Sequence, residues 1–258
     1  MNFWNNVSGA ETFLNCIGNH DSRVSGDWYG LSESDCYNAY IAPYVSNWNL
    51  TSYTEGKCYY YKDYSAGVRL IMLDIMHQTP DQLTWFTNAL VDAKTNNKHV
   101  IVGVHSKPHW KLSPFNTAWD DVISAPYDPE TSDSSASTYY PQNLAAGYSE
   151  AVTDFLDDGG IFICWLHGHT HYKICASLVT DSRQLNIAVA EAGGTDYAWT
   201  YVQARIAGTK SEDNFNVVAI EPDSKILRIA KVGVQYDRLM RKIDTFSYNY
   251  ENHTILTS

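Results

Sequence analysis

Three short apolar segments, each followed at once by histidine-bearing polar residues, constrain this chain more than any other feature. Apolar runs of this length are typical of strands that a largely parallel sheet buries on both faces. Where such strands are parallel neighbours, their carboxyl ends meet at one edge of the sheet, and open α/β sheets place their sites at that edge. The three segments and the residues that follow them are Thr12–Ile17 with Gly18-Asn19-His20-Asp21, His99–Val104 with His105-Ser106-Lys107-Pro108-His109, and Ile161–Leu166 with His167-Gly168-His169-Thr170-His171.

The remaining pattern predicts a mixed α/β fold. Thr79 as N-cap, Pro80 at the first helical position and Gln82 closing a reciprocal cap predict a helix start, and apolar spacing carries this helix to about Asn96. Strand, helix and strand alternate in the middle of the chain and antiparallel strands end it, which indicates a mixed β-sheet sandwich flanked by helices. The other predicted elements are helices over Ser34–Tyr44 and Ser149–Asp158, a hairpin of Lys57–Lys62 with Val68–Asp74, strands Ile174–Thr180 and Leu185–Ala190, and a hairpin of Phe215–Ile220 with Lys225–Val232.

Length and composition favour one domain over residues 1–258. The chain is 44% hydrophobic and 18% charged, as in ordinary globular proteins. Within it, Ser124–Gly147 is polar and without period, which predicts a long surface loop, and residues 213–235 are expected to form a closing hairpin. The net charge of −11 disfavours nucleic acid and anionic membranes as partners, because the mean field of the protein repels both.

Targeting signals and cysteine chemistry give little direction. No apolar run approaches the roughly 18 residues that span a bilayer, and the N-terminus lacks the pattern of a signal peptide, so the compartment stays open. The five cysteines are too irregularly spaced for a zinc ribbon or a Cys-x-x-Cys site. Cys16 and Cys164 lie in apolar runs and are expected to be buried thiols, whereas a pairing of Cys36 with Cys58 is left open.

The histidines at the strand ends predict a metal centre. In an extended segment His169 and His171 point to the same face, so both imidazoles can reach one metal or two adjacent metals. Gly168 before them is expected to allow a sharp turn of the backbone. Together with Asn19 and His105 they offer nitrogen and oxygen donors suited to Zn, Mn or Fe.

These motifs resemble the last three signature blocks of the calcineurin-like metallophosphoesterases. Gly18-Asn19-His20-Asp21, Val104-His105 with Pro108, and Gly168-His169-Thr170-His171 agree with the family in order, spacing and position after strands. The resemblance implies an αββα four-layer sandwich and hydrolysis of a phosphomonoester or phosphodiester by a metal-activated hydroxide. It also implies that Asn19, His105 and His169 bind one metal and His171 the other, that His20 acts beside the scissile phosphate, and that Asp21 orients His20.

The first two blocks of that family, Asp-x-His and Gly-Asp, are absent from the 17 residues before Gly18. We therefore expect an N-terminally shortened relative whose first strands are missing. Such a chain is expected to hold at most one divalent metal ion (Mn, Fe or Zn) where a complete relative holds two, and to have reduced activity. It is also expected to associate with itself through exposed sheet edges.

Two other functions stay open beside the phosphoesterase. One is a non-catalytic remnant or binding module that keeps the fold and at most one metal. The other is a zinc hydrolase acting on a different bond, although asparagine is a rare zinc ligand. The substrate-binding residues and the substrate itself, beyond a phosphorylated molecule, are not determined by the sequence.

The other histidines are expected to be structural. Asp74 and His77, at the end of a predicted strand, favour a role at the entry to the next helix over a substrate contact. His167 is expected to pack or to donate a hydrogen bond, whereas His99 and His253 have no partner nearby in sequence and are predicted to lie on the surface.

Overall fold

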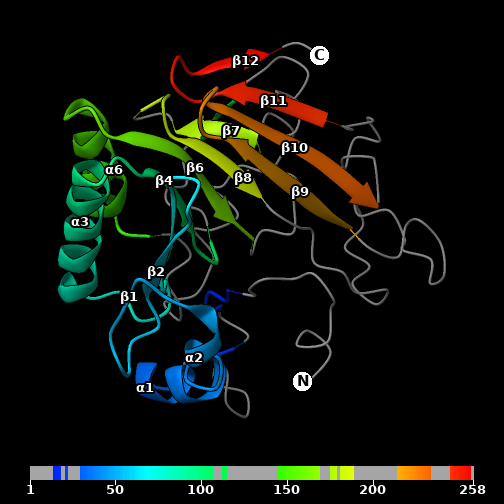
Figure 1. The fold of residues 1–258 in the computed structure, drawn as a ribbon. Coiled ribbons are helices and arrows are strands. Elements are labelled where there is room, and N and C mark those ends of the chain that lie inside the picture. The colour runs from blue at the N-terminus through cyan, green and yellow to red at the C-terminus, as the bar shows by residue number, and fades with distance from the viewer. Residues whose placement is uncertain are drawn as a thin grey trace.

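The computed structural model describes residues 14–18, 21–22, 30–106, 112–114, 144–168, 175–178, 181–188, 214–233 and 245–256. Their fold is mixed α/β, as predicted, with two β-sheets and helices (Figure 1). The helical segments are α1 (Glu33–Cys36), the π-helix η2 (Tyr37–Ile41), α2 (Val45–Trp48), α3 (Pro80–Thr95) and α6 (Ala146–Asp157). The strands are β1 (Ser52–Tyr53), β2 (Tyr60–Asp63), β3 (Val68–Met72), β4 (His99–Gly103), β5 (Leu112–Pro114), β6 (Ile161–His167), β7 (Cys175–Leu178), β8 (Leu185–Ala188), β9 (Asn214–Glu221), β10 (Ile226–Gly233), β11 (Thr245–Asn249) and β12 (Thr254–Leu256).

The larger sheet has eight described strands in the order β1-β2-β3-β4-β6-β8-β7-β5. Its central strands β3, β4, β6 and β8 are mutually parallel, and the outer pairs are antiparallel. The smaller sheet is antiparallel throughout, in the order β12-β11-β10-β9. The predicted hairpins β2–β3 and β9–β10 are therefore present, and so is the parallel pairing of the two histidine-bearing strands β4 and β6.

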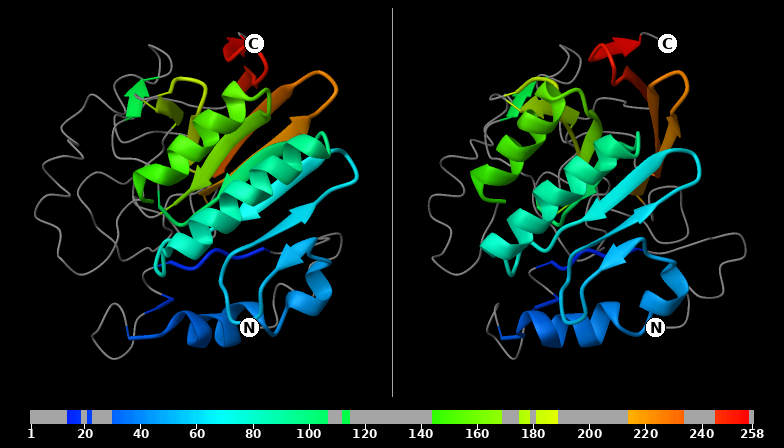
Figure 2. Two further views of the ribbon diagram at one scale, coloured as in Figure 1. Left: turned by 90° about the vertical axis from the view of Figure 1, so that its left-hand side faces the viewer. Right: turned by 60° about the vertical axis from the view of Figure 1, so that its left-hand side comes forward.

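The large sheet is covered on both faces (Figure 2). Helices α3 and α6 lie side by side on one face, and the smaller sheet packs on the other. Side chains of β4 alternate accordingly, because Val100 and Val102 join the core under the helices while Ile101 joins the core between the sheets. Burial on both faces explains the unbroken apolar runs of β4 and β6. The outer helical layer implied by the family resemblance has no counterpart among the described residues.

The first predicted strand is wrong for the residues that the structure describes, since residues 14–18 are not part of a strand. The backbone of Asn15 in this segment forms hydrogen bonds with the side chain of Tyr60, where a strand would bond to the backbone of a neighbouring strand. The Asn15 N–H donates to the Tyr60 hydroxyl at 2.8 Å, and that hydroxyl donates to the Asn15 carbonyl at 2.6 Å. Ile17, only 1% exposed, then places this segment in the main core.

Two details at helix starts differ from the sequence prediction. Thr79 caps α3 as expected, accepting the Gln82 N–H at 3.2 Å, but the Gln82 side chain does not return the bond. It binds the backbone of Asp74 instead. In the predicted loop over residues 124–147, Ala146 and Gly147 belong to the first turn of α6, and residues 124–143 lie outside the described residues.

No disulfide joins the cysteines whose side chains the structure describes. Cys36 and Cys58 are buried without a disulfide between them, and the Cys58 thiol donates to the Glu33 carbonyl at 3.4 Å. Cys164 is buried, and burial raises the pKa of the Cys16 and Cys36 thiols to about 12, so both stay protonated at neutral pH. No helix in the described ranges is both long and apolar enough to cross a bilayer.

His99 was predicted to lie on the surface, which is wrong, whereas His253, predicted to lie there too, is partly exposed. His253 Nδ1 lies 3.0 Å from the Tyr248 hydroxyl. His99, at the start of β4, is 7% exposed and joins the two sheets, because its partners Lys225 and Tyr250 lie in turns that adjoin strands of the smaller one. The Lys225 ammonium can only donate, so His99 Nε2 accepts it at 3.0 Å and Nδ1–H donates to the Tyr250 hydroxyl at 2.9 Å.

The neutral state of His99 makes the contact between the sheets sensitive to acid. Burial, reinforced by the charge of Lys225, lowers the pKa of His99 below its usual 6.5. Its contribution to stability is therefore present above pH 6.5 and is lost as the pH falls through the lowered value. We expect His99→Gln to lose about 1–3 kcal/mol at pH 7.5. In urea unfolding at pH 7.5, 6 and 5 this deficit should shrink with acidification, and a deficit that does not change with pH would contradict the assignment.

Candidate functional site

Two of the three histidine-bearing segments meet at the carboxyl edge of the large sheet. The parallel pairing of β4 with β6 continues beyond both strands, because the Val104 N–H donates to the Leu166 carbonyl at 2.9 Å. The Gly168 N–H then donates to the His105 carbonyl, also at 2.9 Å. The backbone that leads into His169 therefore lies directly beside His105. This juxtaposition was predicted from the strand ends alone.

The third segment arrives at the same place without being a strand. The α-carbon of Gly18 lies against the His105 ring, so closely that a side-chain Cβ at position 18 would stand 2.6 Å from ring atoms Cε1 and Nδ1. Real Cβ contacts are essentially never under 3.0 Å, so only glycine fits here without a shift of its surroundings. The segments at Gly18 and Gly168 thus both contact His105, the first at its ring and the second at its carbonyl oxygen.

A tight turn follows Gly18, and the Asp21 carboxylate takes part in it. The Asp21 and Ser22 N–H groups both donate to the Gly18 carbonyl, at 3.1 and 3.3 Å. In return, the Gly18 N–H donates to Asp21 Oδ2 at 2.9 Å. Asp21 was predicted to orient His20, and the structure gives one of its oxygens the further task of closing this turn. The contact with His20 stays a prediction.

The described part of the site holds only some of the predicted residues. His105 and Asp21 both lie against Gly18, whereas Asn19, His20, His169 and His171 fall outside the described residues. Within the described ranges, no group of three His, Cys, Asp or Glu side chains is placed to hold a metal ion. Asn19, His20 and His169 adjoin Gly18, Asp21 and Gly168 in the chain, and of these three neighbours Gly18 and Gly168 contact His105. The donor types fit a transition metal, and their ligand roles stay a prediction.

The two glycines of the site have different reasons to be glycine. Gly168 was expected to permit a sharp turn, but its φ is not in the left-handed region, and a Cβ there would make an ordinary 3.7 Å contact with the His105 carbonyl. The backbone at Gly168 therefore does not require glycine, whereas the approach of the His105 ring does require it at Gly18. His167, just before Gly168, is 1% exposed and packs inside as predicted.

One structural link at this edge was not visible in the sequence. Asp74 and His77 form the expected pair at the entry to α3, with His77 Nδ1 2.7 Å from Asp74 Oδ2. The Asp-x-x-His spacing is a usable signal for that local pair. The second contact of His77 is with the carbonyl of Leu31, 46 residues earlier, and no local pattern predicts it.

Comparisons with known proteins give a distant likeness in fold. No family model matches the sequence, and no curated protein sequence matches it. Among solved structures, the fold is similar to that of a dimetal phosphatase from Danio rerio, with a TM-score of 0.49 and 12% identity over 86% of this chain and 69% of the other. The likeness assigns no role to any residue of this chain.

The close approach of Gly18 to His105 is tested by a matched pair of glycine substitutions. Gly18→Ala forces the His105 ring or the Gly18 turn to move, which should cost about 1–3 kcal/mol of unfolding free energy. It should also shift the ring resonances of His105. Gly168→Ala, on the neighbouring segment, has room for its methyl group and should cost less than Gly18→Ala in the same urea unfolding measurement. Equal losses in the two variants would show that the contact with the ring is not the constraint.

Proposed function

We propose that this chain is a metal-dependent phosphoesterase whose site lies at the carboxyl edge of the large sheet. The observation that carries the proposal is the convergence of Gly18, His105 and Gly168. It supports the proposal because each of these residues belongs to one of the three motif blocks that resemble the calcineurin-like metallophosphoesterases.

In this proposal Asn19, His105 and His169 hold a divalent transition metal (Mn, Fe or Zn), and His171 belongs to a second position. A bound ion of this kind polarises a phosphoryl oxygen and lowers the pKa of water toward neutrality. His105 contributes an imidazole whose ring is held in place by Gly18 on one side. The backbone of His105 is held by the hydrogen bond that its carbonyl accepts from the Gly168 N–H.

His20 is the proposed acid beside the scissile phosphate, and Asp21 is its orienting partner. A general acid gains from a carboxylate that fixes the orientation of its ring. Asp21 belongs to a turn that is itself closed by hydrogen bonds to Gly18, so the described residues on both sides of positions 19–20 are anchored to each other. The substrate class is a phosphomonoester or phosphodiester of a small molecule, and the site is proposed to belong to one domain of residues 1–258.

Turnover of a chromogenic ester tests the proposed activity. The purified chain should hydrolyse p-nitrophenyl phosphate or its bis ester when Mn, Fe or Zn is supplied. His20→Ala should lower kcat by roughly 100- to 10,000-fold, the usual contribution of a general acid. His253→Gln, on the small sheet, should keep the parental rate. Absence of turnover with every metal, together with retained metal binding, would favour the alternative of a binding module.

Metal content gives a second, independent measurement. Only His171 is assigned to the second position, so we expect the chain to bind at most one equivalent of Mn or Zn tightly, as counted by titration calorimetry and elemental analysis. His105→Ala should abolish that equivalent. Two equivalents bound tightly to the parent chain would overturn this ligand assignment.

Self-association of the chain through exposed edges of the sheet also stays a prediction. Light scattering, which gives the molar mass in solution, tests it.

A further inference from the structure

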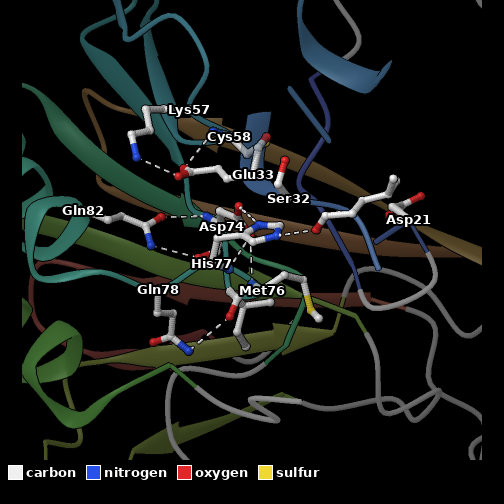
Figure 3. Close-up of polar contacts among 12 residues, drawn as sticks. Asp21, Ser32, Glu33, Lys57, Cys58, Asp74, Met76, His77, Gln78 and Gln82 are labelled. Carbon is white, nitrogen blue, oxygen red and sulfur yellow. Dashed lines mark hydrogen bonds and ion pairs between the residues drawn. The ribbon is translucent and has the colours of Figure 1, made fainter. Parts of the chain in front are cut away.

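Asp74, at the end of β3, is a buried and rigidly held carboxylate (Figure 3). Its side chain is 0% exposed, and the Gln82 amide clamps its backbone, with Oε1 accepting the Asp74 N–H and Nε2 donating to the Asp74 carbonyl, both at 2.8 Å. Asp74 Oδ1 accepts the N–H groups of Met76 and His77, at 2.8 and 3.2 Å. The chain after β3 therefore curls around this carboxylate, and a buried anion of this kind needs a cationic partner.

That partner is His77, whose ring lies between two hydrogen-bond acceptors. Nδ1 is 2.7 Å from Asp74 Oδ2, and Nε2 is 3.1 Å from the Leu31 carbonyl (Figure 3). A neutral imidazole carries one N–H and can donate only one of these bonds. Both bonds form together only in the imidazolium, in which each ring nitrogen carries a proton.

The charges around His77 favour the same state. Burial opposes a charge on the ring, but the hydrogen bond and charge of Asp74, the Leu31 carbonyl and the charge of Glu33 outweigh it and raise the pKa of His77 above 6.5. Glu33, on α1, also forms an ion pair with Lys57 at 2.7 Å, and Asp21 is the charged group on the turn after Gly18. The acidic groups that act on His77 are therefore Asp74 and Glu33, and Lys57 is already paired with Glu33.

The Leu31 contact continues into the candidate site. The Leu31 N–H donates to the Ser22 carbonyl at 3.1 Å, and the N–H groups of Ser22 and Asp21 donate to the Gly18 carbonyl. Gly18 in turn lies against the His105 ring. An unbroken series of contacts therefore connects His77 with the turn that flanks Asn19 and His20 in the chain.

We propose that His77, in its doubly protonated form, is a positioning residue that ties Leu31, and through it Ser22, to the end of β3 and so holds the turn at Gly18 against His105. When His77 loses a proton, the carboxylate of Asp74 retains Nδ1–H because it is the stronger acceptor. The Nε2 lone pair then faces the Leu31 carbonyl, and the tether opens. The catalytic consequence of this step rests on the proposed function, whereas the tether itself does not.

The protonation state is tested on the metal-free chain by nitrogen NMR with labelled histidine, using His77→Gln to assign the signals. We expect both ring nitrogens of His77 to be protonated at pH 6.5 and Nδ1 alone to keep its proton at high pH. A ring that is singly protonated at pH 6.5, or that titrates below 6.5, would overturn the proposal.

The tether is tested by amide hydrogen exchange at Leu31, whose N–H bonds to Ser22. In the parent chain protection of this amide should fall as the pH rises through the titration of His77, after correction for the intrinsic exchange rate. His77→Gln should lack that step, while His253→Gln should keep it. His77→Lys, which stays cationic to about pH 10, should restore protection at alkaline pH. Protection that is the same in the parent and in His77→Gln would contradict the tether, whether or not the lysine variant folds.

Kinetics separate the tether from its catalytic role. With an active parent chain, His77→Gln should lower kcat about tenfold with little change in KM, and it should remove an alkaline loss of kcat that follows the titration of His77. An unchanged kcat and pH profile would overturn the positioning role. If the parent chain hydrolyses no phosphoester, the proposed function fails, and NMR and hydrogen exchange still decide whether the tether exists.

Discussion

The parallel pairing of β4 with β6 is the interaction on which the rest of the structure depends. It places two apolar strands at the centre of a sheet that is covered on both faces, and it continues past the strand ends through the bonds of Val104 with Leu166 and of Gly168 with His105. The register of β4 against β6 is set by side chains buried in the core. That register fixes the position of His105 relative to Gly168 after the two strands end. The candidate site is therefore positioned by hydrophobic burial several residues away from its chemistry.

Two histidines at opposite edges of this sheet, His99 buried and His77 partly buried, show how neighbours set a protonation state. His99 lies between an ammonium that can only donate and a tyrosine hydroxyl, so it is neutral. His77 lies between a carboxylate and a carbonyl, which can only accept, so it is cationic. The same side chain thus supports the contact between the sheets in one state and the edge of the candidate site in the other, with opposite dependence on pH.

The approach of Gly18 to His105 connects packing with the proposed chemistry. The segment before Gly18 is anchored through Asn15 to the Tyr60 hydroxyl, and the segment after it returns through Leu31 to His77. Both anchors belong to the hairpin of β2 and β3 or to the residues that follow it. The turn at Gly18 is consequently anchored on one side by Tyr60 of β2 and on the other by His77, which follows β3. These two anchors explain how the turn lies at the edge of the sheet without belonging to a strand.

The sequence by itself determined the strands β3, β4 and β6, the start of α3 at Thr79 and Pro80, and the meeting of His105 with the Gly168 segment. These features follow from apolar runs, local capping and the geometry of parallel strands, and residues close together in the sequence determine all three. Only the tertiary structure decided that residues 14–18 are held by Tyr60, that Gln82 serves Asp74, that His99 is buried between the sheets and that His77 reaches Leu31. Three of these features depend on a side chain that contacts a group dozens of residues away in the sequence. The fourth depends on which of several local groups Gln82 bonds to. The spacing of residues along the chain predicts neither kind of contact.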